Sequence, residues 1–431
     1  MKRLTYSAKI ITTILFLLFY ANSIAATFRL SNDHSLGNGN RVAIEGKIVD
    51  ETTGKPLTFA SVTVVGTNIG TVSNTEGEFY LSIDDELDVK EIIFQHLGYK
   101  NKIVPLSSLI GKKNTITLES HSIPLEEIVV RPDDPYQLVR EVIKRIPQNY
   151  CTEPMKHMAF YRESVMKKKK YVSISEAVVE VYKASYNNEF GTDMVKLYKG
   201  RKSSNVKPQD TVIVKLKGGP KSALLLDIAK NPIVLFNEDN FDSYVFRIDE
   251  VTKINDKNNY IIDFKQVKDY EYPLFNGKLY VDINTLAITA AEFSLNIENE
   301  EQASLLFVKK KPLMMKITPI ETKYFVKYKE ENGKYYFSHA RGEIVFKIDW
   351  DKKLFNSRYT IMTEIASTDR TNKNVVKFTN EEQLKSTIIF EDKVLPYADP
   401  EFWGEYNIIK PEESIENAIK KYGVILKIQD N

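Results

Sequence analysis

The residues of this chain that could do chemistry are five histidines, one cysteine and many carboxylates. A zinc peptidase needs histidine and carboxylate ligands close enough to hold one ion, and a glutamate that activates water. The histidines stand singly, with no HxxE or HExxH arrangement, at His34, His96, His121, His157 and His339. We therefore interpret them as surface or strand histidines and predict no metal site. A ligand set that assembles only in three dimensions is the alternative.

Motifs for nucleophilic catalysis and for phosphate binding are also missing. The sequence contains no Gly-x-Ser-x-Gly elbow, and Cys151 stands in a polar connector without a catalytic signature. Residues 218–222 (GGPKS) lack the spacing of a phosphate loop and fit the start of a helix better. We predict no catalytic residue, no cofactor-binding residue and no cofactor, and hence a protein that is not an enzyme. A hydrolase with a non-local site is the alternative.

The first 25 residues have the features of a secretory signal peptide. Basic residues at the start precede the apolar run 11–20, and Ser23 and Ala25 are small residues at the −3 and −1 positions of a cleavage site. The pattern predicts export, cleavage after Ala25, and a location in the periplasm or at the outer membrane. An uncleaved N-terminal anchor is the alternative. No later stretch has the length of a transmembrane helix, so we predict no span in the mature chain.

Charge and cysteine content exclude some partners and some modes of stabilisation. The whole chain has a formal net charge of +2, and loss of a leader with three basic residues leaves it close to neutral. There is therefore no electrostatic reason to expect nucleic acid as a partner. A single cysteine cannot form an intrachain disulfide, so packed cores must supply the stability. The length of 431 residues suggests two or three domains.

Residues 42–120 alternate between short β-rich runs and turn signals, after a polar lead-in at 26–41 that we expect to be flexible. About seven runs at close spacing indicate a small antiparallel sandwich. Within it, residues 70–83 (GTVSNTEGEFYLSI) have the pattern of a hairpin, with Gly77 at a turn position that favours positive φ.

This region resembles a known family along an ordered series of short motifs. The matching pieces are Gly46–Asp50, Gly54–Leu57, Ala60–Val64, Gly66–Thr67, Gly70–Thr71, Glu76–Gly77 with Phe79, and Leu97–Tyr99. They are similar to the carboxypeptidase regulatory-like (carboxypeptidase D regulatory-type) domain of Gram-negative bacterial envelope proteins. The resemblance implies a transthyretin-like, seven-stranded β-sandwich that carries no catalytic residues of its own.

The remaining chain predicts a second, larger β domain. After a linker at 121–133, residues 134–390 contain long alternating segments joined by short polar turns, which indicate a broad antiparallel sheet. A helix near 135–146 precedes them. Residues 260–264 and 277–288 resemble the half-barrel of periplasmic lipoprotein-carrier proteins. The expected fold class is mainly β: the sandwich, then a large antiparallel sheet that this resemblance would curl into a half-barrel, with a few helices.

A second helix is predicted at 220–230 and is apolar almost all round, so it should be buried on most sides. We expect it to lie on the concave face of the sheet, facing strands such as 277–296. The residues that would form a core or line a cavity there are Leu224, Leu225, Leu226 and Ile228. A charge introduced at Leu225 should then destabilise the fold by several kcal/mol. If the helix fills the hollow, the domain is a docking body; if it leaves space, an acyl chain could enter.

The C-terminal tail, 391–431, combines an aromatic cluster with a short helix after Pro411. We expect Phe402, Trp403 and Tyr406 to dock the tail on the main body. The lysine run 167–170 lies between two alternating segments and predicts an exposed hairpin turn, with an anionic membrane surface as the alternative partner.

Together these features predict a secreted, non-enzymatic protein of the cell envelope that acts as an interaction or structural module. Its partner would be an envelope protein or a lipid, and its oligomeric state stays open. The main alternative is a periplasmic carrier for a lipid or a lipoprotein acyl chain, and the second alternative is the hydrolase with a non-local site.

Overall fold

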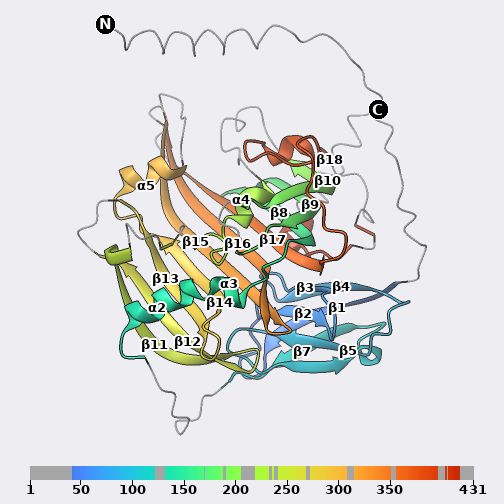
Figure 1. The fold of residues 1–431 in the computed structure, drawn as a ribbon. Coiled ribbons are helices and arrows are strands. Elements are labelled where there is room, and N and C mark those ends of the chain that lie inside the picture. Colours follow the sequence, from blue (N-terminus) through green and yellow to red (C-terminus); the bar gives the residue numbers. More distant parts are fainter. Residues whose placement is uncertain are drawn as a thin grey trace, which may run out of the picture. The chain divides into compact units, whose positions relative to one another are not determined.

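The structure is a computed structural model, and the residues that it describes contain three β-sheets (Figure 1). The described residues are 41–121, 132–168, 170–187, 191–204, 219–232, 235–236, 241–267, 272–307, 315–350, 356–396, 403–404 and 406–417. They all belong to one compact unit. The signal peptide predicted at 1–25, the lead-in before Arg41, most of the linker, and the chain after residue 417 lie outside the described residues.

The first two sheets enclose a common apolar core and build the predicted seven-stranded sandwich. The strands of one sheet, in spatial order, are β4 (Glu78–Asp84), β1 (Arg41–Asp50) and β7 (Lys113–Leu118). Those of the other are β3 (Gly70–Val72), β2 (Ser61–Val64), β5 (Glu91–Gln95) and β6 (Lys102–Pro105), followed by the short helix η1 (Leu106–Ser108). Because β1 and β7 run parallel, the sandwich is not antiparallel throughout as predicted.

The hairpin predicted at 70–83 is wrong, since β3 and β4 pair in different sheets. The side-chain oxygen of Asn74 accepts hydrogen bonds from the backbone N–H groups of Glu76 and Glu78, at 2.9 and 2.8 Å. This local turn redirects the chain from one sheet to the other. Gly77 completes it at φ +76°, where an added Cβ would lie 2.6 Å from the carbonyl oxygen of Ile48. Residues 73–77 therefore form a corner between the two sheets.

The third sheet is large and open, as the predicted fold class requires. Its strands, in spatial order, are β11 (Tyr244–Ile254), β12 (Lys257–Gln266), β13 (Phe275–Asp282), β14 (Ile288–Leu295), β15 (Met315–Glu331), β16 (Lys334–Trp350), β17 (Ser357–Thr371), β8 (Met155–Lys167), β9 (Lys170–Lys183), β10 (Met194–Ser204) and β18 (Leu395–Pro396). All neighbours are antiparallel except the short edge strand β18. The lysine run is the tight β8–β9 turn, as predicted, with Lys167 paired to Lys170.

Short helices accompany this sheet. They are α2 (Pro135–Lys144), α3 (Ile146–Asn149), α4 (Pro220–Leu224), α5 (Glu300–Phe307), η3 (Phe241–Ser243) and η4 (Phe390–Lys393). Helix α2 begins where the sequence predicts, because the Asp134 side chain accepts hydrogen bonds from the N–H groups of Tyr136 and Gln137, and Pro135 has no N–H that would need an acceptor. Among the helices described, none combines the length and apolar character needed to cross a bilayer.

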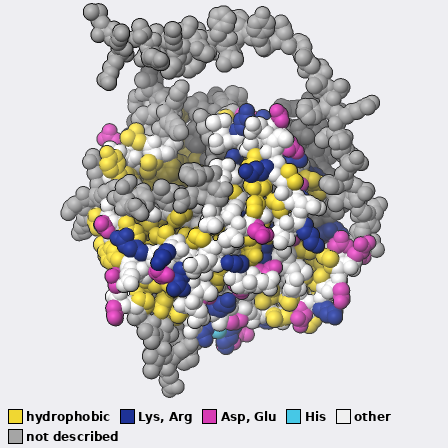
Figure 2. Space-filling model, viewed as in Figure 1, with side chains coloured by type: hydrophobic (Ala, Val, Ile, Leu, Met, Phe, Trp, Pro, Cys, Tyr) yellow, Lys and Arg dark blue, Asp and Glu magenta, His cyan; other side chains and the backbone are white. Residues whose placement is uncertain are grey.

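The large sheet is covered on both faces. Along β15, Val326 and Tyr328 enter the main apolar core, which also holds residues of α2 and α4, and these helices lie in front of the sheet in Figure 1. Side chains alternate along a strand, so Lys327 and Lys329 point to the opposite face, where they contact Ser61 and the carbonyl oxygen of Thr67 in the sandwich. On the face seen in Figure 2, the described basic and acidic side chains are interspersed among apolar ones.

Candidate functional site

The helix predicted at 220–230 is shorter than expected. Helix α4 ends at Leu224 and packs on β10, β16 and β17, whereas the later residue Ile228 borders Leu279 and Ile288 of the predicted strands 277–296. Leu224 and Ile228 are buried and Leu226 is partly buried in the main core, but Leu225 is 58% exposed. The prediction that Leu225 faces the sheet is therefore wrong. Only one side of this segment meets the sheet, so a continuous apolar run cannot bury every member.

Among the described residues, the space between this segment and α2 is nearly filled. The cavity left between Val139 and Val142 of α2, Ile228, and the sheet residues Leu279 and Ile288 measures about 10 Å³. That is about the minimum that holds one water molecule. On this face, the described residues form a packed core rather than a lined hollow.

A buried polar cluster anchors the segment after α4. The Asp227 carboxylate accepts hydrogen bonds from the hydroxyls of Tyr328 (2.8 Å) and Tyr186 (2.7 Å) and pairs with the Lys183 ammonium at 2.5 Å. Burial alone would lower the pKa of Lys183, but Asp193 and Asp227 raise it. Sequence reasoning missed this cluster, although an aspartate in the middle of an apolar run (LLLDIA) was a signal for a paired buried charge.

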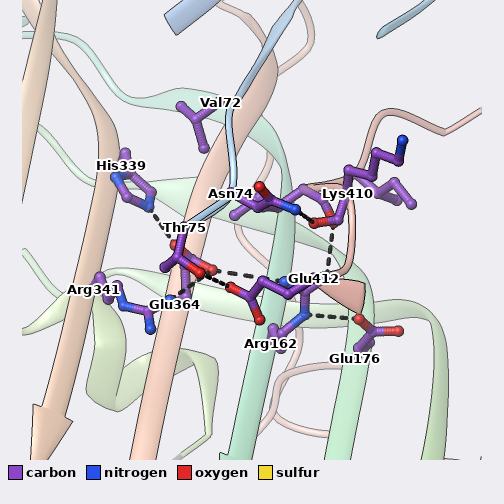
Figure 3. Close-up of polar contacts among 12 residues, drawn as sticks. Val72, Asn74, Thr75, Arg162, Glu176, His339, Arg341, Glu364, Lys410 and Glu412 are labelled. Atoms are coloured by element: carbon purple, nitrogen blue, oxygen red, sulfur yellow. Dashed lines mark hydrogen bonds and ion pairs between the residues drawn. The ribbon is translucent and has the colours of Figure 1, made fainter. Parts of the chain in front are cut away.

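On the opposite face, the C-terminal residues 406–413, here called the clasp segment, lie between the sandwich and the sheet (Figure 3). Thr71 of β3 donates to the carbonyl of Ile408 (2.8 Å), and Asn74 of the corner donates to the carbonyl of Lys410 (3.1 Å). From the sheet, Arg162 donates to the carbonyl of Ile409 at 2.7 Å. The clasp segment therefore joins the two parts of the fold.

The predicted docking of the aromatic cluster is confirmed for two of its members. Trp403 packs against Phe160 of β8, with ring centroids 5.5 Å apart, and Tyr406 packs against the same cluster. Phe402 lies outside the described residues.

Beneath the clasp segment, the sheet carries a layer of buried charges. Arg162 is fully buried, and its guanidinium donates to Glu176 at 2.8 Å, which also pairs with Arg201 at 2.7 Å. Glu364 accepts from His339 at 2.9 Å and pairs with Arg341 at 3.5 Å. These partners outweigh burial, which acts in the opposite direction, and lower the pKa of Glu364 to about 2. Charges that are buried in this way must stay paired, so they favour one fixed position of the covering segments.

A cleft of about 590 Å³ opens beside this layer, between the sandwich and the same face of the sheet. Its sandwich wall consists of Thr58, Phe59, Thr75, His96 and Leu97. Phe59 has a left-handed backbone (φ +60°), which is strained for a residue other than glycine. Its ring stacks on Phe325 at a centroid distance of 5.7 Å.

The floor of the cleft is built from cross-strand pairs of β15 and β16. Lys323 lies opposite Glu343, and Phe325 lies opposite Arg341. Lys327 is the next residue on this face of β15 and also lines the cleft. Glu292 of β14 adjoins this floor. Phe293 and Tyr324 also border the cleft, but their rings stack on each other in the core on the opposite face. Sequence reasoning missed this site, since each strand alone has only an ordinary alternating pattern.

Lys327 is a buried cation in the lining of the cleft. It is only 4% exposed, and its ammonium donates to the Ser61 hydroxyl at 3.0 Å. Burial lowers its pKa to about 8. Burial, and then the nearby Lys327 charge, lower the pKa of His96 to about 4, so this histidine is neutral at pH 7. Desolvation without a carboxylate partner thus dominates the electrostatics at this end of the cleft.

The other described histidines and Cys151 do not form a common site. Among the described residues, no three His, Cys, Asp or Glu side chains are placed together to hold a metal ion. His157 is buried and bonded to Ser367, His121 pairs with Asp256, and Cys151 donates to a backbone carbonyl. His34 lies outside the described residues.

Comparison with known families identifies the class of the first domain. Residues 44–130 match the family model of the CarboxypepD_reg-like domain, so the chain carries a domain of this class, as its motifs predict. The match covers the sandwich and continues into the region of the linker. A comparison with curated proteins finds no match.

Solved structures similar to the chain align with a little over half of it. A DUF1329 family protein from Desulfovibrio piger is 15% identical, with 57% of this chain and 95% of that chain covered and a TM-score of 0.23. A putative outer membrane lipoprotein-sorting protein domain from Vibrio parahaemolyticus is 11% identical, with 56% and 94% covered and a TM-score of 0.23. MucB is 10% identical, with 52% and 92% covered and a TM-score of 0.19. Similarity at this level assigns no ligand to this chain.

Proposed function

We propose that this chain is an exported, non-enzymatic binding module of the cell envelope, in which the sandwich and the large sheet act as one body. The observation that carries the proposal is the cleft of about 590 Å³ between them. Its volume lies within the range of small-molecule sites, and it combines aromatic walls with a few charged groups, as such sites do.

The contacts that hold the sandwich against the large sheet support a binding role for the two together. Val72 of the sandwich, Phe160 of the sheet and Ile409 of the clasp segment share one apolar cluster. This anchoring fixes the two walls of the cleft relative to each other. A preformed cleft binds a ligand without the cost of ordering its own walls.

The two alternatives receive less support from the geometry. A carrier that uses the helix-covered face would need space there, whereas the cavity at Val139 and Ile228 is about 10 Å³. A hydrolase would need a base that reaches its substrate, whereas the His339–Glu364 pair is fully buried. The ring of His339 is also covered by Phe59, at a centroid distance of 5.3 Å.

A thermal-shift experiment tests the binding role. The mature protein is heated with neutral, cationic and anionic amphiphiles, each below its micellar concentration. Thr58→Trp adds bulk to the cleft wall, and Lys55→Trp places the same side chain on an exposed turn of the sandwich as a control. At least one class of amphiphile should raise the melting temperature of the wild type and of Lys55→Trp, but not of Thr58→Trp. If no class distinguishes these proteins, the proposed binding role is wrong.

Export is tested separately by intact-mass measurement of the protein from the periplasmic and membrane fractions. The expected mass lacks the residues up to Ala25. A chain that retains its N-terminus in those fractions would contradict cleavage, and a chain found only in the cytoplasm would contradict the envelope location.

A further inference from the structure

We propose that the cleft binds small amphiphilic carboxylates, in which one carboxylate is joined to an apolar body, and that Lys327 pairs with the carboxylate. This inference rests on the proposed binding function and names the ligand class for the same site.

The first argument is the position of Lys327. It lines the cleft but is 4% exposed, and a hydroxyl, Ser61, accepts its one hydrogen bond within the described residues. In the part of the chain that the structure describes, Lys327 forms no ion pair. Lysine is seldom buried without a carboxylate, because the ammonium loses its hydration and gains no charge in return. An anion in the cleft would supply the missing partner.

The other cations of the cleft already have partners. Lys323 pairs with Glu321 at 2.5 Å. Arg341 pairs with Glu343 at 3.4 Å and with Glu364 at 3.5 Å. Among the described residues of the lining, Lys327 is thus the lysine or arginine that has no carboxylate partner.

The charge balance favours a monoanion. One lysine balances one carboxylate, whereas a phosphate monoester brings almost two negative charges at pH 7. The lining also contains the carboxylates Glu292 and Glu343, which would repel the excess charge. A carboxylate at the Lys327 end therefore fits the cleft better than a phosphate does.

The rest of the lining suits an apolar body. Phe59, Leu97 and Phe325 present apolar surface from both walls. The volume of about 590 Å³ lies in the range of small-molecule sites, so it accommodates a medium-length alkyl chain or an aromatic group. The pKa of Lys327, lowered to about 8 by burial, agrees with this assignment, because a bound carboxylate would offset the desolvation.

The test uses fluorescence titration of the mature protein with 11-(dansylamino)undecanoic acid at pH 7, with its uncharged methyl ester as the matched ligand. Lys327→Met removes the charge at similar length, and Lys327→Arg retains it. Lys329→Met is the matched protein control, because Lys329 lies on the same strand and face, has a pKa lowered to about 8 by burial, and contacts Thr67 outside the cleft lining.

We expect Lys327→Met to weaken binding of the acid at least tenfold, Lys327→Arg to stay within about threefold of the wild type, and Lys329→Met to have no effect. The ester should bind weakly and equally to all four proteins. Dodecanoate should displace the probe at lower concentration than dodecyl phosphate. Circular dichroism establishes that each variant is folded.

Three results would overturn the inference: equal binding of acid and ester, unchanged binding by Lys327→Met, or loss with Lys327→Arg as large as with Lys327→Met. Thr58→Trp distinguishes a wrong ligand class from a wrong binding role of the cleft. If both probes bind the wild type but not Thr58→Trp, the cleft is a binding site and only its carboxylate preference is refuted. If Thr58→Trp changes nothing, the binding role itself is refuted.

Discussion

Replacing Lys327 with methionine should raise the free energy of unfolding, although Lys327 is buried at the interface between the sandwich and the sheet. Burial lowers the pKa of this lysine from 10.5 to about 8. The difference between these two pKa values corresponds to about 3 kcal/mol, which is the cost of keeping the ammonium protonated at pH 7 in the folded state. Methionine removes that cost and also loses the hydrogen bond to Ser61, worth about 1 kcal/mol. The net gain should be about 2 kcal/mol.

The pH dependence gives this prediction its sharpest form. Since the folded pKa of Lys327 lies below the unfolded pKa, the unfolded state binds more protons between about pH 8 and 10.5, and the wild type gains stability as the pH rises through that window. The advantage of Lys327→Met should therefore be full at pH 7 and small at pH 10.5. Lys329 is present in both proteins, so its own shift cancels in the difference.

Urea unfolding at pH 7 and at pH 10, followed by tryptophan fluorescence, measures both quantities. Trp403 lies beside the clasp segment and Trp350 at the end of β16, so the signal reports on two regions of the fold. A variant that is less stable than the wild type at pH 7 would refute the reasoning, as would a stability difference that does not change with pH. A stabilised variant that no longer binds carboxylates would identify Lys327 as a residue kept for binding at the expense of stability.

Three further predictions concern other parts of the fold. Burial raises the pKa of Glu163 to about 8, so the stability of the wild type should fall as the pH rises from about 4.5 to 8. Urea unfolding at pH 5 and pH 8 should show that Glu163→Gln is more stable than the wild type at pH 8, by an amount on the order of a few kcal/mol. Leu225→Asp should change the free energy of unfolding by no more than about 0.5 kcal/mol because Leu225 is exposed, whereas Leu224→Asp should cost about 3 kcal/mol or more; equal effects would contradict the observed burial. Trp403→Ala should cost about 3–5 kcal/mol and make the C-terminal segment sensitive to limited proteolysis, and an unchanged cleavage pattern would show that the clasp segment is held without it.

The sequence by itself determined the local structure and the class of the first domain. About seven short β-rich runs separated by turn signals in residues 42–120 predict the sandwich, because turn residues reverse the chain by local backbone chemistry. The start of α2 is equally local, since Asp134 and Pro135 satisfy the helix end without help from elsewhere. The long strands of the large sheet follow from their alternating pattern.

Only the tertiary structure decided how the faces are covered, and with this the location of the cleft. Alternation along β15 groups Lys323, Phe325 and Lys327 on one face, but it cannot say whether water or another domain lies against that face. For the same reason, the apolar run near Leu225 could not reveal which of its sides meets the sheet. Periodicity is a property of a single element, whereas burial depends on contacts between residues far apart in the chain, such as Lys327 and Ser61. The local pattern therefore leaves the buried lysine, its missing partner and the cleft beside it undetermined.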